Sequence, residues 1–453
     1  MVSSKSAAAL PVVVVGAGPV GLAAAARLLE RGLKPLVLEA GPAAGTAVRA
    51  WGHVRLFSAW SEVVDPAAAK LLAPTGWQQP EGTRYPTGEE WATDYLQPLA
   101  EVLGDRVRLR TEVTGVARAG RDRLVDADRT DQPFTVHTRT ADGAEGRITA
   151  RAVIDASGTW STPGPLGGDG LPAVGEPSAA ARISYRIPDL RDPAVRKRYA
   201  GRRTAVAGSG ASAFTTLALL AELAREVPGT KAVWILRRGL GADTFGGGEA
   251  DQLPARGALG LRARQAVTDG HAEAVTGFRT AAVETADGQL TLVAEDGRRL
   301  EPVDEVVALT GLRPELSVLS ELRLGLDERL QAPVALAPLI DPNIHSCGTV
   351  YPHGAKELAH PEQNVYIVGM KSYGRATTFL ALTGYEQVRS VAAALAGDHE
   401  DAARVELTLP ETGVCSGGGL TAESAGGQDS SAAAEEDGCC SAPAGTPVRA
   451  GGC

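Results

Sequence analysis

Cysteine is scarce in this chain of 453 residues, and its placement is uneven. The chain has no C-x-x-C motif, which excludes the dithiol through which a thioredoxin-type redox site works. The adjacent pair Cys439-Cys440 is a poor substitute, because it lies in a stretch of Gly, Ser, Ala and acidic residues. The five cysteines are Cys347, Cys415, Cys439, Cys440 and Cys453.

An excess of positive charge is also missing. The chain has 45 Lys and Arg against 54 Asp and Glu, a net charge of −9, which argues against a nucleic-acid partner. The one long uncharged run, residues 7–26, is broken by Gly16, Gly18, Pro19 and Gly21, so it predicts no membrane span. We therefore expect a cytoplasmic protein of more than one domain with no membrane attachment.

What the chain does have is glycine, and the first informative group of glycines is Gly16-Ala17-Gly18-Pro19-Val20-Gly21. It follows the apolar, β-branched run Val12 to Val15, which is typical of a strand buried on both faces. The alanine-rich stretch Leu22 to Leu29 after it favours a helix. Strand, tight turn and helix are the context in which a G-x-G-x-x-G pattern indicates a dinucleotide site.

Each glycine of this turn has a physical role in such a site. Gly16 makes the tight turn, Gly18 lets the backbone approach a pyrophosphate, and Gly21 allows the helix to pack closely on the strand. The helix N-terminus then presents unpaired N–H groups to the phosphates. The next predicted strand, Pro35 to Leu38, ends in Glu39, whose carboxylate can accept hydrogen bonds from ribose hydroxyls and would repel a 2′-phosphate. The first site therefore fits FAD or NAD.

A second turn, Gly208-Ser209-Gly210-Ala211-Ser212-Ala213, follows the strand-like run Thr204 to Ala207. Ala213 replaces the third glycine, which the fingerprint tolerates. The next predicted strand, Ala232 to Leu236, ends in Arg237-Arg238 and not in an acid. Guanidinium groups suit a 2′-phosphate, which favours NADPH; the alternative is a solvated basic strand end.

These patterns predict an α/β fold with two Rossmann-like dinucleotide-binding domains. We expect residues 1–177 and 306–400 to form a first domain and residues 178–305 to form a second domain inserted into it. Residues 163–177, rich in Gly and Pro, predict a linker or surface loop. From residue 414 to residue 453, aliphatic bulk is too low to offset chain entropy, so we expect a disordered tail.

Several segments resemble the FAD- and NADPH-dependent two-dinucleotide flavoproteins of the flavin-containing monooxygenase group, over residues 10–397. Asp155-Ala156-Ser157-Gly158 and residues 309–314 are similar to segments that cross between domains beside the flavin in that group. Residues 51–58 and 85–88 are also similar to it. The resemblance implies contacts to FAD from Gly16, Gly18, Pro19, Gly21, Glu39, Trp51, Gly158 and Gly369. It implies contacts to NADPH from Gly208, Gly210, Ser212, Ala213, Arg237 and Arg238.

Two departures from that group concern the chemistry. The F-x-G-x-x-x-H fingerprint that precedes the second turn in the monooxygenases is absent, and residues 176–189 stand in its place with no histidine. The last flavin-domain strand ends in Gly369-Met370-Lys371, without the Gly-Asp of thioredoxin-reductase-like enzymes. The missing histidine fingerprint argues against a reaction with oxygen. The missing Gly-Asp argues against a thioredoxin-reductase-like enzyme and so favours a monooxygenase.

The resemblance implies a monooxygenase that oxygenates a small soft nucleophile (a sulfur, nitrogen or arsenic centre) or a ketone through a C4a-peroxyflavin. Lys371, Tyr373 and Arg375 are the candidate catalytic residues, because a cation there would stabilise reduced flavin or the peroxide. The alternative is an ordinary surface loop. We expect no resident metal, a small-molecule substrate with molecular oxygen, and a monomer or homodimer.

Two other functions fit the same sequence. One is an NADPH-dependent flavin reductase that passes electrons to a quinone, a metal or a partner protein. The other is a sensor that captures a soft metal or metalloid with its cysteine-bearing tail. Residues 370–379 and that tail resemble flavoproteins encoded in actinobacterial arsenic-resistance clusters. The sequence itself does not name the substrate.

Overall fold

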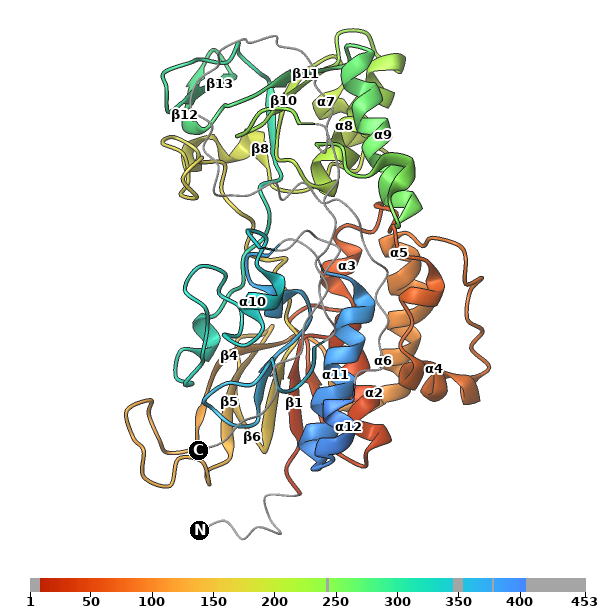
Figure 1. The fold of residues 1–453 in the computed structure, drawn as a ribbon, viewed down its shortest axis with the longest axis vertical. Helices are drawn as coiled ribbons and strands as arrows, with labels where there is room; N and C mark the ends of the chain where they lie inside the picture. Colours follow the sequence, from red (N-terminus) through yellow and green to blue (C-terminus); the bar gives the residue numbers. More distant parts are fainter. Residues whose placement is uncertain (1–8, 242–243, 345–352, 377–378, 405–453) are drawn as a thin grey trace, which may run out of the picture.

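The computed structural model describes residues 9–241, 244–344, 353–376 and 379–404. It has two α/β units, one above the other in Figure 1, joined by chain crossings between them. The fold confirms the prediction of parallel sheets in two dinucleotide-binding domains. The predicted disordered tail, residues 414–453, and all five cysteines lie outside the described residues.

The first sheet is parallel throughout and has the strand order β15-β7-β1-β2-β3. Its central strand, Val-Val-Val-Val, is buried on both faces, as an all-parallel sheet covered on both sides requires. The strands are β1 (Val12–Val15), β2 (Pro35–Leu38), β3 (Val107–Arg108), β7 (Ala152–Asp155) and β15 (Val365–Ile367).

Helices cover one face of this sheet and an antiparallel sheet covers the other (Figure 1). The antiparallel sheet contributes Val113, Phe134 and Val136 to a core shared with Val13 of β1. Its strands are β4 (Thr111–Arg118), β5 (Phe134–Thr140) and β6 (Glu145–Ala150). The helices of the first unit are α2 (Pro19–Glu30), α3 (Thr46–Arg49), α4 (Pro66–Leu72), α5 (Gly88–Trp91), α6 (Gln97–Leu103), α10 (Ala337–Ile340), α11 (Ala381–Ala396) and α12 (His399–Ala403).

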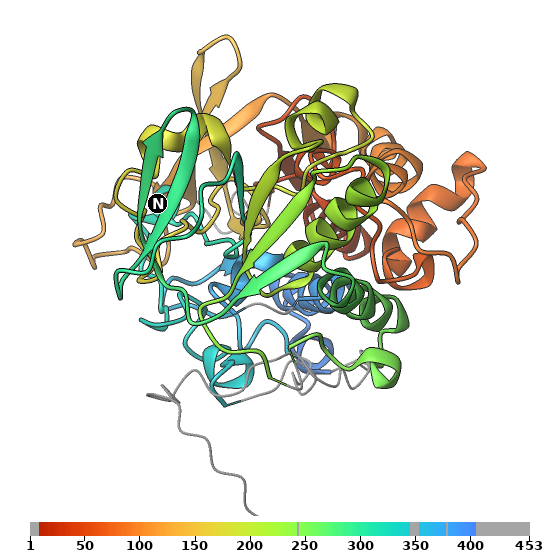
Figure 2. The same ribbon diagram turned by 90° about the horizontal axis from the view of Figure 1, so that it is seen from above.

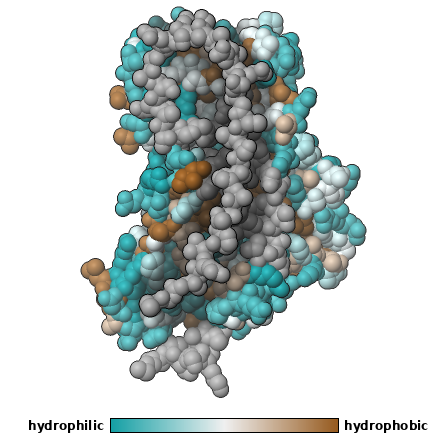
Figure 3. Space-filling view, in the orientation of Figure 1, coloured by the Kyte–Doolittle hydropathy of each residue, from teal (hydrophilic) through white to brown (hydrophobic). Residues whose placement is uncertain are grey.

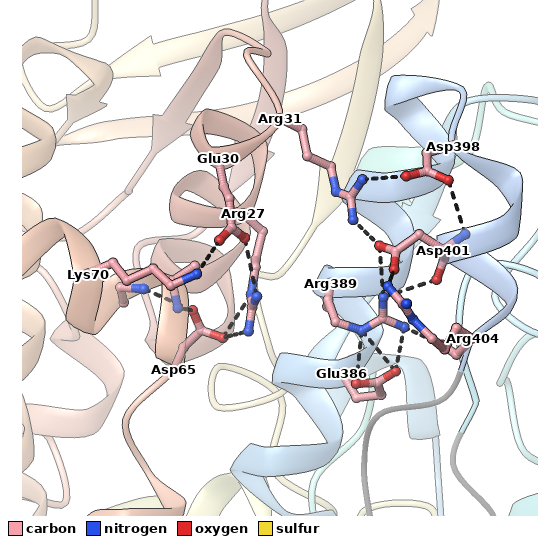
Figure 4. Close-up of polar contacts among 12 residues, drawn as sticks. Arg27, Glu30, Arg31, Asp65, Lys70, Glu386, Arg389, Asp398, Asp401 and Arg404 are labelled. Carbon is pink, nitrogen blue, oxygen red and sulfur yellow. Dashed lines mark hydrogen bonds and ion pairs between the residues drawn. The ribbon is translucent and has the colours of Figure 1, made fainter.

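Charged side chains join α2 to its neighbours on both sides (Figure 4). On one side, Arg27 donates to the buried Asp65, with Nη2 2.8 Å from Oδ2, and the other oxygen of Asp65 caps α4. On the other side, Arg31 pairs with Asp398 and Asp401 at the start of α12. These contacts fix the direction of α2, and with it the place of its N-terminus.

The second unit is built around another parallel sheet, with the order β11-β10-β9-β14-β8. An antiparallel hairpin lies apart from this sheet, as the view from above shows (Figure 2). Residues 164–176 run along the hairpin, where Gly168 N–H donates to the Thr280 carbonyl at 2.8 Å. The elements are β8 (Ile183–Ser184), α7 (Pro193–Tyr199), β9 (Arg203–Ala207), α8 (Ala211–Glu226), β10 (Lys231–Ile235), α9 (Pro254–Thr268), β11 (Ala272–Val275), β12 (Thr280–Ala286), β13 (Gln289–Ala294) and β14 (Glu305–Ala308).

The two crossings place the carboxyl edges of the two parallel sheets toward each other. The first crossing leaves the end of β7, and the second leaves the end of β14. They run antiparallel side by side, with Gly164 N–H 2.8 Å from the Gly311 carbonyl and Arg313 N–H 2.8 Å from the Thr162 carbonyl. Since ligands of open α/β sheets bind at carboxyl edges, two bound dinucleotides would meet here.

The chain passes from one sheet to another between β3 and β4. β3 ends at Arg108, and β4 begins at Thr111 in a different sheet. Arg110 adopts a φ of 53° and turns the chain between the two sheets. Arginine has no special preference for this left-handed conformation, so residue type gave no signal of the break.

The described residues contain no helix that is both long enough and apolar enough to cross a membrane. Hydrophilic residues dominate the part of the face in Figure 3 that grey atoms leave visible, and hydrophobic residues are scattered over it.

Candidate functional site

The first glycine turn is packed tightly at two positions and open at the third. Gly16 has a φ of 96°, and a Cβ there would lie 2.9 Å from the Ala156 carbonyl oxygen of the first crossing. A Cβ at Gly21 would lie 2.0 Å from the Gly16 carbonyl oxygen. A Cβ at Gly18 would meet no atom within 4 Å. The tight positions shape the turn, and the open one leaves room for a ligand.

The N-terminus of α2 borders this open space. Gly18 is its N-cap, no side chain caps the helix, and Pro19 occupies the first position, where its missing N–H is no loss. The remaining N–H groups and the positive end of the helix dipole suit an anion. The residues present therefore fit the pyrophosphate of a dinucleotide such as FAD.

Glu39 lies at the carboxyl end of β2, beside the first turn. Its carboxylate accepts hydrogen bonds from Ala17 N–H at 2.7 Å and from Gly41 N–H at 2.8 Å. Each carboxylate oxygen keeps lone-pair capacity for a further donor. Glu39 thus fixes the turn, and a contact of its carboxylate with ribose hydroxyls stays a prediction.

The other three residues predicted to contact FAD come from three separate segments of the first unit. Gly158, in the first crossing, has a φ of 70° and open space where a Cβ would be. Gly369, after β15, has a φ of 69° and lies against Val20 of α2. Trp51 follows α3, and its ring packs so closely on Gly88 that a Cβ there would come within 2.7 Å.

The second turn repeats the arrangement of the first. Gly208 has a φ of 134°, and a Cβ there would lie 2.3 Å from the Leu309 carbonyl oxygen of the second crossing. A Cβ at Gly210 would meet nothing within 4 Å. Gly210 is the N-cap of α8, and no side chain caps this helix. Ala213 is fully buried, and Ser212 lies in the first turn of α8, where its carbonyl accepts the Thr216 hydroxyl at 3.0 Å. This site too fits a pyrophosphate.

Arg237 and Arg238 follow β10, as the sequence places them, and both are exposed. Partial desolvation, together with the neighbouring guanidinium groups of Arg238 and Arg279, lowers the pKa of Arg237. Within the described part of the chain, Arg237 has no hydrogen bond or ion pair. An uncompensated cation at this strand end can bind an anion.

Lys371, a candidate catalytic residue, forms a buried ion pair. Its Nζ lies 2.7 Å from Asp155 Oδ2 and 3.0 Å from Ser157 Oγ, and the Lys371 and Asp155 side chains are 1% and 0% exposed. The other Asp155 oxygen accepts the Ser157 backbone N–H at 3.0 Å and hydroxyl at 2.6 Å. The pair joins the ends of β7 and β15 next to the first turn.

The structure does not bring Lys371, Tyr373 and Arg375 together. Tyr373 is buried, its ring packs edge-on against Phe379 with centroids 5.0 Å apart, and burial raises the pKa of its hydroxyl. Arg375 is exposed, and its Nε donates to Gln331 Oε1 at 2.9 Å. The three side chains therefore have separate surroundings, and only Lys371 reaches the carboxyl edge of the sheet.

Sequence reasoning missed Gln387, on α11. Its Oε1 accepts the Gly369 N–H at 2.8 Å, and its Nε2 lies 2.9 Å from both Ser372 Oγ and His353 Nε2. This amide fixes the loop after β15 to the helix behind it. A glutamine in an amphipathic helix carries no sequence signal of such a role.

A cleft of about 420 Å³ lies between the two units, and its lining residues could not be read from the sequence. Arg49, His53 and Glu89 line it from the first unit, and Asp189 and Arg191 line it from the second. Its charges are paired within each wall, since Arg49 binds Glu89 at 3.0 Å and Arg191 binds Asp189 at 2.8 Å. Arg198 also lines the cleft, and its Nε lies 2.7 Å from Glu305 Oε2. The cleft therefore has little net charge.

A histidine, His53, lines this cleft. Its Nε2 atom is buried and has no hydrogen-bond partner among the described residues. Burial lowers the pKa of the imidazole more than the facing Asp189 raises it, and Arg191 lowers it further. This shift favours the neutral form of the imidazole.

Comparison with solved structures shows the same fold in a disulfide reductase and in monooxygenases. A bacillithiol disulfide reductase from Bacillus cereus matches 86% of this chain and 99% of its own, with a TM-score of 0.61 and 19% identity. A cadaverine monooxygenase from Erwinia amylovora, solved with FAD, matches 88% and 98%, with a TM-score of 0.58 and 17% identity. A flavin-containing monooxygenase from Stenotrophomonas maltophilia matches 85% and 99%, with a TM-score of 0.52 and 23% identity.

A search of curated proteins found no match. A family model described as pyridine nucleotide-disulphide oxidoreductase matches residues 13–336, which include both glycine turns and both crossings. This match confirms a flavin-dependent oxidoreductase that uses FAD and a pyridine nucleotide. The chain belongs to the pyridine nucleotide-disulphide oxidoreductase family.

Proposed function

We propose that this protein is an NADPH-dependent flavin monooxygenase that oxygenates a small molecule in the cleft between its two units. The observation that carries the proposal is the absence of cysteine from residues 1–346, which contain both turns, both crossings and the cleft. No dithiol from this part of the chain can receive electrons beside the first turn. A small molecule that enters from solvent is then the acceptor.

The chain's own residues have distinct tasks in this proposal. The turn at Gly18 and the carboxylate of Glu39 would hold FAD, and the turn at Gly210 would hold NADPH. Bound there, FAD would supply the chemistry that carries two electrons from the nicotinamide to oxygen. The two crossings hold the carboxyl edges of the two sheets together.

His53 supports a nucleophilic substrate in the cleft. An amine or thiol attacks only in its unprotonated or thiolate form, so a neutral imidazole in the cleft can accept the substrate's proton. Arg49 and Glu89 form an ion pair with each other. In the wall formed by the first unit, His53 is therefore the side chain that we expect to accept the proton. The substrate we infer is small and carries little net charge.

Aerobic turnover with NADPH separates this proposal from a flavin reductase. We expect NADPH consumption to rise with a small sulfur-, nitrogen- or arsenic-containing substrate, with one oxygenated product formed per NADPH. The measurement compares the amount of oxygenated product with the amount of hydrogen peroxide formed. NADPH consumed with a quinone or metal acceptor, and peroxide alone with every oxygenation substrate, would identify the reductase instead. The arsenic-resistance resemblance stays a prediction that the arsenic substrate tests.

The preference for NADPH is tested with Arg237→Ala. Loss of one charge-assisted hydrogen bond costs about 1.5 kcal/mol, so we expect the KM for NADPH to rise about 10-fold. The KM for NADH should stay within about twofold, because NADH has no 2′-phosphate. Steady-state rates with both nucleotides measure this difference. Equal changes for the two nucleotides would show that Arg237 does not bind the phosphate.

A further inference from the structure

We propose that Arg279 binds the 2′-phosphate of NADPH together with Arg237, and that Glu295 holds the Arg279 guanidinium until the phosphate displaces it. This inference rests on the proposed use of NADPH and names two residues that decide its specificity. Arg279 lies 42 positions from Arg237 in the sequence, next to β12.

The backbone brings the two arginines to the same edge. Strands β10 and β11 are parallel neighbours, with Ile235 opposite Val275. The chains stay together beyond the strands, because Phe278 N–H donates to the Leu236 carbonyl at 2.9 Å and Gly277 N–H approaches the Arg238 carbonyl at 3.3 Å. Both arginines therefore follow carboxyl ends of adjacent parallel strands, where a ligand of this sheet binds.

The charges near Arg237 are arranged for an added anion. Arg238 and Arg279 both act on Arg237 electrostatically, and both disfavour its charged form. Arg237 is repelled by both neighbouring guanidinium groups, and a phosphate bound beside Arg237 would relieve that repulsion. Arg298, which is also near, is held by Asp296 at 2.7 Å and by the Thr276 carbonyl at 3.2 Å.

Glu295 is a partner that Arg279 can exchange. Arg279 Nε lies 3.1 Å from Glu295 Oε2, and the two side chains are 45% and 44% exposed. Their backbones are fixed to each other, with Glu295 N–H 2.9 Å from the Arg279 carbonyl. An exposed ion pair contributes little to stability, so a phosphate with two negative charges can replace the carboxylate at small cost. NADH, which has a 2′-hydroxyl, would leave the pair intact.

Calorimetric titration of the FAD-loaded protein with adenosine 2′,5′-bisphosphate and with 5′-AMP tests this inference without any electron acceptor. We expect Arg279→Ala to weaken binding of the bisphosphate about 10-fold and to leave 5′-AMP unchanged. We expect Glu295→Gln to strengthen bisphosphate binding about threefold, because the phosphate no longer competes with a carboxylate. A structural role for the pair would predict weaker binding in both variants.

Arg299→Ala is the matched control. Arg299 pairs with Glu284 across the same β12–β13 hairpin, and both side chains are about half exposed. We expect no change in binding of either nucleotide. If Arg279→Ala binds both nucleotides as the unaltered protein does, or weakens both equally, the role of Arg279 is overturned. If Arg237→Ala also leaves bisphosphate binding unchanged, the NADPH preference fails with it, so the two failures are distinguishable.

Discussion

Gly18→Val is expected to give a folded protein that no longer holds FAD, whereas Gly210→Val is expected to give a yellow protein that NADPH does not reduce. A Cβ at either position would have no protein atom within 4 Å, apart from those of the adjacent residues. Both glycines are helix N-caps with extended backbone, φ of −77° and −97°, which valine also adopts. The added methyl groups would therefore clash with a bound pyrophosphate and not with the protein.

The size of the effect follows from what valine blocks. It removes close approach of the phosphate to the N-terminus of α2 or α8, and we expect each nucleotide to bind at least about 100-fold more weakly, a loss of about 2.7 kcal/mol. Flavin absorbance after desalting measures the first loss. Anaerobic bleaching of the flavin by NADPH measures the second.

Gly115→Val is the matched control for these two variants. Gly115 lies in β4, away from both turns, and a Cβ there also meets no atom within 4 Å. This variant should bind FAD and be reduced normally. A Gly18→Val protein that remains yellow, or a Gly210→Val protein that loses FAD while NADPH still reduces added flavin, would contradict the assignment of one nucleotide to each turn.

The sequence predicted the two turns, their strands and their helices because the residues that make each of them are neighbours in the chain. Gly16 and Gly21, for example, are five positions apart, and the contact between them is set within one strand-turn-helix unit. The acid after the first turn and the arginines after the second also lie at fixed offsets. Local patterns of this kind carry enough information to identify a dinucleotide site.

The sequence could not predict contacts between residues that are far apart in the chain. Lys371 was assigned a role from its place after a strand, but its partner Asp155 is 216 positions away. Arg279 and the cleft beside His53 likewise depend on how neighbouring strands and whole units meet. Asp155 was noted as part of a crossing segment, yet nothing in that motif says that its carboxylate faces a lysine.

Lys371→Met is expected to lower the free energy of unfolding by about 3–5 kcal/mol, the second large effect that the structure predicts. Methionine preserves much of the side-chain length, but it leaves the Asp155 carboxylate buried with only Ser157 as a partner. An uncompensated buried charge is costly because it has lost its hydration without gaining a counterion. Urea unfolding of the flavoprotein, followed by far-ultraviolet circular dichroism, measures the loss.

Lys70→Met is the control for loss of a lysine ion pair as such. Lys70 pairs with Glu30 at 2.8 Å, but its side chain is 73% exposed, so we expect a change of less than about 1 kcal/mol. Similar losses in Lys371→Met and Lys70→Met would show that the buried pair contributes no more than a surface pair.

The double variant Lys371→Met with Asp155→Asn separates a structural role for Lys371 from a catalytic one. Asparagine removes the buried charge and can still accept the Ser157 hydrogen bonds, so most of the lost stability should return. If turnover returns with stability, Lys371 acts by holding the ends of β7 and β15 beside the flavin site. If the stable double variant binds FAD and is reduced by NADPH but forms no oxygenated product, the Lys371 ammonium is needed for the chemistry itself.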